Sequence, residues 1–113
     1  MPNVTPTEFQ EAKVFAAWLS TQKVIFSHLA QETFTRSWGI KMKNKISGVH
    51  SGVPDYIIIT DNGLLFVELK RTKGGVVSDA QRYWIESLNK CAGVQAEVCK
   101  GAEQAIEFVK RFL

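Results

Sequence analysis

Residues 56–70 read YIIITDNGLLFVELK, two apolar runs separated by an Asp-Asn-Gly turn. Asn62-Gly63 is a strong hairpin signal, because both central residues of a type I′ turn need positive φ. The flanking runs are apolar at consecutive positions, so each strand is expected to be covered on both faces. The stretch therefore predicts an antiparallel hairpin of strands 56–60 and 64–70 in the middle of a sheet.

A helix is predicted before the hairpin. Residues 5–8 (TPTE) form a capping-box pattern with Thr5 as N-cap and Glu8 as its acid, and proline stands at the first helical position. Apolar residues at helical spacing follow and predict a helix over residues 6–21. They are Phe9, Ala12, Ala16 and Leu19.

Four more elements complete the predicted order. Residues 24–29 are short and apolar and predict a strand, whereas residues 30–53 lose periodicity and collect glycines and cations, as functional loops do. Ser78 opens a second helix with Gln81 closing an S-x-x-Q capping box; a strand over 94–99 and a helix over 102–112 follow. The order α-β-β-β-α-β-α predicts an α/β fold, a mixed β-sheet flanked by helices.

The chain has 113 residues and a formal net charge of +3. This length is typical of one domain, so we expect a single stand-alone domain over residues 1–113 without a deep enclosed pocket. The sequence shows neither an apolar run of about 20 residues nor the basic and apolar regions of a signal peptide. These features exclude a membrane protein and predict a cytoplasmic one.

The hairpin register places three polar side chains on one face. If Asn62-Gly63 is a two-residue loop, Asp55 lies opposite Lys70, and Glu68 lies diagonally from Asp55. Opposed residues and residues two apart share a face, so Asp55, Glu68 and Lys70 project to the same side. A three-residue turn would instead put Asp55 on the other face.

This grouping has two interpretations. Glu68 and Lys70 can form a solvated pair on an exposed strand, or the two carboxylates can converge on a hard cation beside a lysine that faces phosphate. Glu68 stands between Val67 and Leu69 in an apolar run, where an uncompensated charge costs several kcal/mol. A bound metal ion keeps such carboxylates ionised, which favours the metal site.

The same residues resemble the PD-(D/E)xK nucleases. Pro54-Asp55 followed by Glu68-Leu69-Lys70 matches that pattern, and the whole string resembles the VRR-NUC branch, the virus-type replication-repair nucleases. That branch shows G-x-PD, ExK, a glycine and S-x-x-Q, matched here by residues 52–55, 68–70, 75 and 78–81. The resemblance implies a restriction-endonuclease-like core and a Mg²⁺- or Mn²⁺-dependent endodeoxyribonuclease without an organic cofactor.

Site roles follow from the resemblance. Asp55, Glu68 and the backbone carbonyl of Leu69 would hold the metal ion, and Lys70 would orient the attacking water and offset charge on the phosphorane. Gln81 would contact the nucleophile or Lys70, with helix capping as the alternative.

Glu32 lies in an upstream segment, residues 28–32, and would be an additional or water-linked ligand. Gln31 replaces the asparagine of the family pattern there. Glu8 stands where some relatives carry a glutamate near the site, but we interpret it as the capping-box acid. His28 and His50 lack metal-ligand spacing, and Trp18 and Trp84 are interpreted as core residues on amphipathic helices.

Cations flank the motif residues on both sides and predict contacts to DNA phosphates rather than to bases. They are Arg36, Lys41, Lys43, Lys45, Arg71, Lys73 and Arg82, and Trp38 stands among the first four. The resemblance suggests branched DNA, including four-way junctions, in a bacterial cell or a phage-infected host.

Cutting both strands needs two sites, which predicts a homodimer joined through apolar residues of the first or last helix. The alternative is a catalytically silent DNA-binding module that keeps the fold.

Overall fold

The computed structural model describes residues 4–29 and 47–113. The elements in these ranges are α1 (Glu8–Leu19), β1 (Ile25–His28), β2 (Tyr56–Thr60), β3 (Gly63–Lys70), α3 (Asp79–Asn89), β4 (Val94–Lys100) and α4 (Ala102–Lys110). Their order is the α-β-β-β-α-β-α order predicted from the sequence. No helix in the described ranges is long and apolar enough to cross a membrane.

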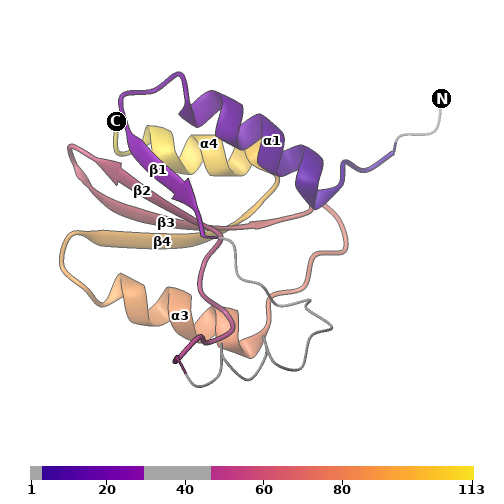
Figure 1. The fold of residues 1–113 in the computed structure, drawn as a ribbon. Helices are drawn as coiled ribbons and strands as arrows, with labels where there is room; N and C mark the ends of the chain where they lie inside the picture. Colours follow the sequence, from indigo (N-terminus) through magenta and orange to yellow (C-terminus); the bar gives the residue numbers. More distant parts are fainter. Residues whose placement is uncertain (1–3, 30–46) are drawn as a thin grey trace.

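The sheet is mixed and has the strand order β1-β2-β3-β4. β1 pairs with β2 and β2 with β3 in antiparallel fashion, while β3 and β4 run parallel. α1 and α4 cover one face, and α3 lies on the other (Figure 1). The predicted α/β class and the central position of the β2–β3 hairpin are therefore confirmed.

The helices share a direction relative to the sheet. β3 and β4 run toward the end of the molecule at which α1, α3 and α4 begin (Figure 1). A parallel β3–α3–β4 crossover requires α3 to return antiparallel to the two strands, so α3 starts near the end of β3. The ends of β3 and β4 therefore meet helix N-termini, whose partial positive charge favours anions.

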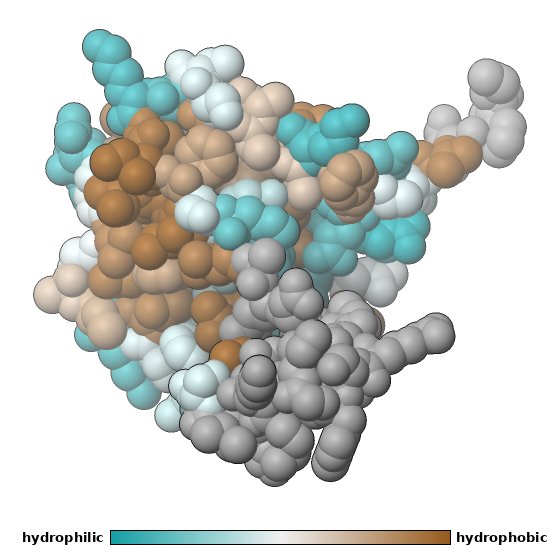
Figure 2. Space-filling model, viewed as in Figure 1, coloured by the Kyte–Doolittle hydropathy of each residue, from teal (hydrophilic) through white to brown (hydrophobic). Residues whose placement is uncertain are grey.

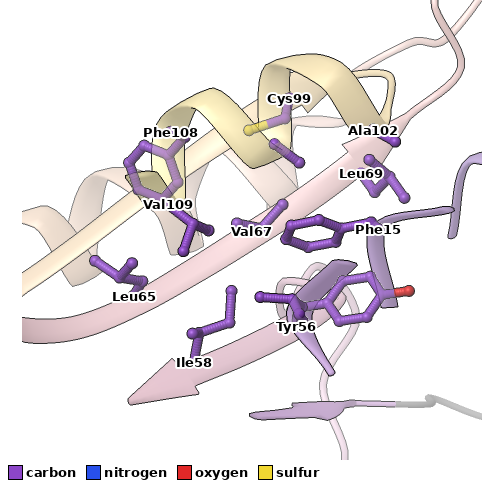
Figure 3. Packing of buried hydrophobic residues seen from close by; sticks show 12 residues of the cluster. Phe15, Tyr56, Ile58, Leu65, Val67, Leu69, Cys99, Ala102, Phe108 and Val109 are labelled. Atoms are coloured by element: carbon purple, nitrogen blue, oxygen red, sulfur yellow. The ribbon is translucent and has the colours of Figure 1, made fainter. Parts of the chain in front are cut away.

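The hydrophobic core fills the layer between the sheet and the α1–α4 pair (Figure 3). Phe15 of α1 meets Tyr56 of β2 edge-to-face with ring centroids 5.1 Å apart. The buried members of this core are Phe15, Leu19, Tyr56, Ile58, Leu65, Val67, Leu69, Cys99, Ala102, Ala105, Phe108 and Val109. Alternate residues of β2 and β3 thus point into this layer, which leaves Glu68 and Lys70 on the α3 side.

The α3 side of the sheet is covered only in part. α3 packs against β4 and has no fully buried residue of its own. Ile25 of β1 and its partner Ile59 of β2 are 71% and 48% exposed. Hydrophobic surface is visible on the left of the view in Figure 2. The expectation that the hairpin is covered on both faces holds fully for the α1–α4 side alone.

The first helix starts later than the sequence predicted. Its N-cap is Thr7, whose side chain accepts from Gln10 N, while Gln10 Oε1 accepts from Thr7 N at 2.8 Å. Residues 5–8 and 7–10 both fit the capping pattern, and the second of them forms. Phe9 is 73% exposed, so the buried stripe runs through Glu11, Phe15 and Leu19 instead.

The hairpin turn also differs from the prediction. Thr60 pairs with Gly63, so the two-residue loop is Asp61-Asn62 rather than Asn62-Gly63. Thr60 Oγ1 accepts from Asn62 N at 3.1 Å and donates to the Gly63 carbonyl at 3.0 Å, which fixes this loop. The register shifts by two residues, and a shift of two keeps every side chain on its predicted face.

Candidate active site

Two carboxylates meet at the end of the β2–β3 hairpin. Tyr56 pairs with Val67, and extending this register by one residue places Asp55 directly opposite Glu68 rather than Lys70. Asp55 Oδ2 accepts from Leu69 N at 2.8 Å, which fixes the Asp55 side chain against β3. The sequence predicted a diagonal pair, and the corrected register brings the carboxylates closer than that pair would be.

Glu68 is the unusual member of this pair because it is only 2% exposed. Burial, together with the charge and hydrogen bonding of Asp55, raises the pKa of the Glu68 carboxyl to about 9. The positive charge of Lys70 acts in the opposite direction. Glu68 therefore holds a proton at neutral pH unless a cation takes that place.

Gln81 joins α3 to this carboxylate. Its Nε2 donates to Glu68 Oε2 at 3.2 Å, while its Oε1 accepts from Ser78 N at 2.9 Å. The sequence offered the capping box and a contact to the nucleophile or Lys70 as alternatives, and the structure shows the capping box together with a contact to Glu68. The contact reaches Glu68 rather than Lys70, because the amide oxygen is engaged by Ser78 and the amide nitrogen faces β3.

Two glycines let the surrounding loops approach the site. A Cβ on Gly52, which has φ +94°, would lie 2.6 Å from the backbone carbon of Ala80. A Cβ on Gly75 would lie 3.0 Å from Lys70 Cβ. Close contact at these two positions gives a physical reason for both glycines of the G-x-PD and G…S-x-x-Q pattern.

Leu69 contributes backbone rather than side chain, which is buried in the core at 1% exposure. Its N–H points to Asp55, and the carbonyl of an extended residue lies on the same side as its N–H. The Leu69 carbonyl thus faces the carboxylate end. On the other side, Leu29 N donates to the Asp55 carbonyl at 2.6 Å and attaches the end of β1 to Asp55.

Glu8 is a residue whose predicted role was wrong. It takes no part in the cap, which Thr7 and Gln10 form, and it is exposed in the first turn of α1. Its negative charge raises the pKa of Glu68 and of Tyr56, so it stands within electrostatic range of the carboxylate pair. The sequence signal was available in the likeness to relatives with a glutamate here, and the capping interpretation obscured it.

The predicted DNA-contacting cations divide into two groups. Arg71 and Lys73 are exposed in the turn that follows β3, and Arg82 is exposed on α3, where it forms an ion pair of 3.1 Å with Asp79. The other predicted residues lie outside the described ranges. They are Glu32, Arg36, Trp38, Lys41, Lys43 and Lys45.

The remaining aromatic and histidine predictions are mixed. Trp18 packs against the core as expected, whereas Trp84 lies outside the core cluster and is half-buried. His28 stacks on Tyr56 with ring centroids 4.8 Å apart.

Within residues 4–29 and 47–113, no three His, Cys, Asp or Glu side chains gather into a cluster that could hold a metal ion. The described part of the site is thus a carboxylate pair with a neighbouring lysine and amide.

Comparison with known proteins finds a matching family model and a matching solved structure. The model of the VRR-NUC domain family matches residues 5–103. A solved structure described as a VRR_NUC domain protein is 26% identical, with a TM-score of 0.77, over 100% of this chain and 91% of that chain. A comparison with curated proteins finds no match. The family model covers nearly the whole chain. The chain therefore belongs to the VRR-NUC domain family and has the nuclease-type fold that this name denotes.

Proposed function

We propose that the protein is a metal-dependent endodeoxyribonuclease that hydrolyses phosphodiester bonds. The observation that carries this proposal is the buried Glu68 carboxyl beside Asp55, with Lys70 on the same strand face and Gln81 bonded to Glu68. A binding surface for DNA needs no buried acids, because carboxylates repel phosphates. A buried acid beside a partly buried one at the end of a sheet instead suits a site that holds a cation between the protein and a phosphate.

The donors present fit a hard divalent ion. Asp55 and Glu68 supply carboxylate oxygens, and the Leu69 carbonyl faces the same end, which is the oxygen set that Mg²⁺ or Mn²⁺ prefers. Burial and Asp55 raise the pKa of Glu68, and a cation bound between the two acids would keep both of them ionised. When bound, the ion would polarise a phosphoryl oxygen and lower the pKa of a bound water.

Two further acids are candidates for the same role. Glu8 lies within electrostatic range of Glu68. Glu32 follows Leu29 by three residues, and three residues span at most about 10 Å. Leu29 is bonded to Asp55, and we keep Glu32 as a proposed additional or water-linked ligand.

Lys70 and Gln81 have separate tasks in this proposal. The Lys70 ammonium stands close enough to Glu68 to lower its pKa, and there it would orient the attacking water and offset charge on the phosphorane. Gln81 holds the Glu68 carboxylate in one orientation through its amide nitrogen. Such fixed donors and charges stabilise a transition state without reorganising during the reaction.

DNA would lie across the end of the sheet where the helices begin. Arg71, Lys73 and Arg82 are exposed near this end and offer contacts to phosphates, to which the cations of residues 36–45 would add. Such contacts read charge and shape rather than base sequence. Branched DNA, including four-way junctions, is the proposed substrate class.

A homodimer would supply two sites for cutting both strands. On the first helix, the exposed apolar residues that are candidates for the interface are Phe9 and Val14, at 73% and 55%. The sheet adds a pair that sequence reasoning missed, Ile25 and Ile59. Mutating each pair to serine and measuring the mass in solution would distinguish the two surfaces.

The test of the nuclease is cleavage of a labelled four-way junction, a flap and a linear duplex with Mg²⁺ or Mn²⁺. Wild type should cut at least one of them, and Glu68→Ala and Lys70→Ala should lose activity by at least 100-fold, of the order seen for removed acid–base or electrostatic groups. Tight DNA binding without metal-dependent cutting would instead identify a DNA-binding module. Cutting by Glu68→Ala at the wild-type rate would move the site elsewhere.

A further inference from the structure

A hollow of about 400 Å³ lies on the flank of α3, and the nuclease chemistry does not use it. Its walls are His50 and Ser51 from the chain before β2 and Ala80, Tyr83 and Trp84 from α3. We call these five residues the α3 hollow. Trp84 Nε1 donates to the Ser51 carbonyl at 3.2 Å, which holds the indole in one orientation. Tyr83 is 71% exposed, so one face of its ring is open to a ligand.

Both walls of the α3 hollow adjoin, along the chain, segments that reach the candidate active site. On one wall, Ala80 directly precedes Gln81, whose amide contacts Glu68. On the other, Gly52 follows Ser51 and presses against the Ala80 backbone, three residues before Asp55. Neighbouring Cα atoms are about 3.8 Å apart, so the hollow lies within the span of a few nucleotides from the carboxylate pair.

The chemistry of the lining indicates what it would hold. Two aromatic rings and a methyl group offer an apolar, π-rich surface, and no carboxylate lines the hollow among the described residues. A larger hollow of about 630 Å³, beside α4, is lined by four acids and two cations, so its net charge disfavours a polyanion; they are Glu11, Glu97, Glu103, Glu107, Lys100 and Arg111. Only the α3 hollow, of these two, combines aromatic surface with a lining that tolerates nearby phosphates.

We propose that the α3 hollow binds an unpaired nucleobase of the DNA next to the scissile phosphate, with the base stacked on Tyr83. The proposal rests on the nuclease function above and adds a determinant of substrate structure. Bases inside a duplex are stacked on one another and hide their faces, whereas a base at a branch point or in a single strand can stack on a protein ring. The hollow would therefore favour DNA with unpaired nucleotides over continuous duplex.

The test is binding in metal-free buffer at fixed salt, where no cleavage can occur whatever the catalytic status. The probe is a flap with 2-aminopurine as the unpaired base at the branch, compared with a fully paired duplex. Wild type should quench the 2-aminopurine fluorescence, and Tyr83→Ala should abolish the quench and weaken flap binding about 10-fold, as loss of one stacked base does. Duplex binding should stay unchanged, and Tyr83→Phe should match wild type.

Matched controls keep the result interpretable. Tyr83 is outside the core, so its replacement should leave the melting temperature unchanged, and Val76→Ala removes a comparable exposed apolar side chain that does not line the hollow. Flap binding and quenching by Tyr83→Ala equal to wild type would overturn the proposal and leave the nuclease standing. Equal losses on flap and duplex would also overturn it. Tyr83-dependent quenching without metal-dependent cutting would support the hollow and reject the nuclease.

Discussion

Gln81 Nε2 donates to Glu68 Oε2 across 3.2 Å and thereby joins the first turn of α3 to the interior strand β3. The same amide accepts from Ser78 N through its oxygen, so one side chain both caps the N-terminus of α3 and orients the buried acid. Because the two ends of the amide have different partners, the two roles can be separated by mutation.

Gln81→Glu should abolish the contact to Glu68 while keeping the cap, because glutamate serves equally well at this capping-box position. A second carboxylate against Glu68 should lower the cleavage rate by about 10-fold or more, given about 1.4 kcal/mol per tenfold change. Ser78→Ala is the matched variant, since it removes the cap and leaves the Glu68 contact. It should cost about 1 kcal/mol of unfolding free energy with cleavage largely retained.

Urea unfolding and junction cleavage on both variants would check this separation. Equal loss of cleavage in Ser78→Ala and Gln81→Glu would show that the position of the helix end, rather than the amide on Glu68, controls activity.

The stability of the metal-free protein should depend on pH through Glu68. The carboxyl ionises near pH 4.5 in the unfolded chain, whereas burial and Asp55 raise the pKa of Glu68 in the folded protein to about 9. Its contribution to stability is therefore full below pH 4.5 and is lost as the pH rises toward 9. Glu68→Gln cannot ionise and should be more stable than wild type at pH 7, by up to about 3 kcal/mol.

Thermal unfolding at pH 5, 7 and 9 in chelator would measure this difference, with the exposed Glu86→Gln as the control. Mg²⁺ should stabilise wild type more at high pH, because the ion replaces the proton on Glu68, and it should have little effect on Glu68→Gln. Parallel pH profiles for wild type and Glu68→Gln would contradict the assignment of the raised pKa.

Much of the fold could be predicted because its signals are local. The Asn-Gly turn, the Ser78–Gln81 capping box and the alternation of apolar residues each depend on a few neighbouring residues, and the predicted element order is confirmed. The hairpin loop was wrong by one residue and the strand register by two, because Asp61-Asn62 and Asn62-Gly63 offer turns of the same length. The error left the site intact, since a shift of two preserves the face.

What the sequence could not provide depends on contacts between distant segments. Glu11 is buried, and its carboxylate accepts from the backbone N–H of Ala102, ninety-one residues later. No local sequence pattern signals that contact. The need for a glycine at position 52 likewise arises only from the close approach of Ala80. The shared face of Asp55 and Glu68 was predictable from the hairpin, but their direct opposition depended on the exact loop. The contact of Gln81 with Glu68 required the packing of α3 on the sheet.

Gly52 should tolerate no side chain, for a reason separate from its backbone conformation. Gly52 and Gly48 have similar φ values of +94° and +88°, but a Cβ at Gly48 would meet nothing within 4 Å. Gly48→Ala should therefore cost about 1 kcal/mol from backbone strain alone. Gly52→Ala should cost more and should also reduce cleavage, because Ala80 and the Asp55 segment must move apart.

Melting temperature and cleavage of the same junction substrate would measure both effects. Equal destabilisation by the two alanines, with equal activity, would show that the approach of Gly52 to Ala80 is unimportant.

Glu11 should act as the cap that α4 lacks. The N-cap position of α4 is Gly101, which has no side chain to accept a bond, and Glu11 Oε2 accepts from Ala102 N at 3.1 Å instead. Glu11→Ala leaves this buried N–H without a partner and should lower the unfolding free energy by about 1 to 3 kcal/mol. Glu103→Ala, an exposed acid in the same first turn of α4, removes only a charge near the helix N-terminus and should cost less than about 1 kcal/mol. Urea unfolding of the two variants provides the comparison, and equal costs would assign Glu11 to helix electrostatics rather than to capping.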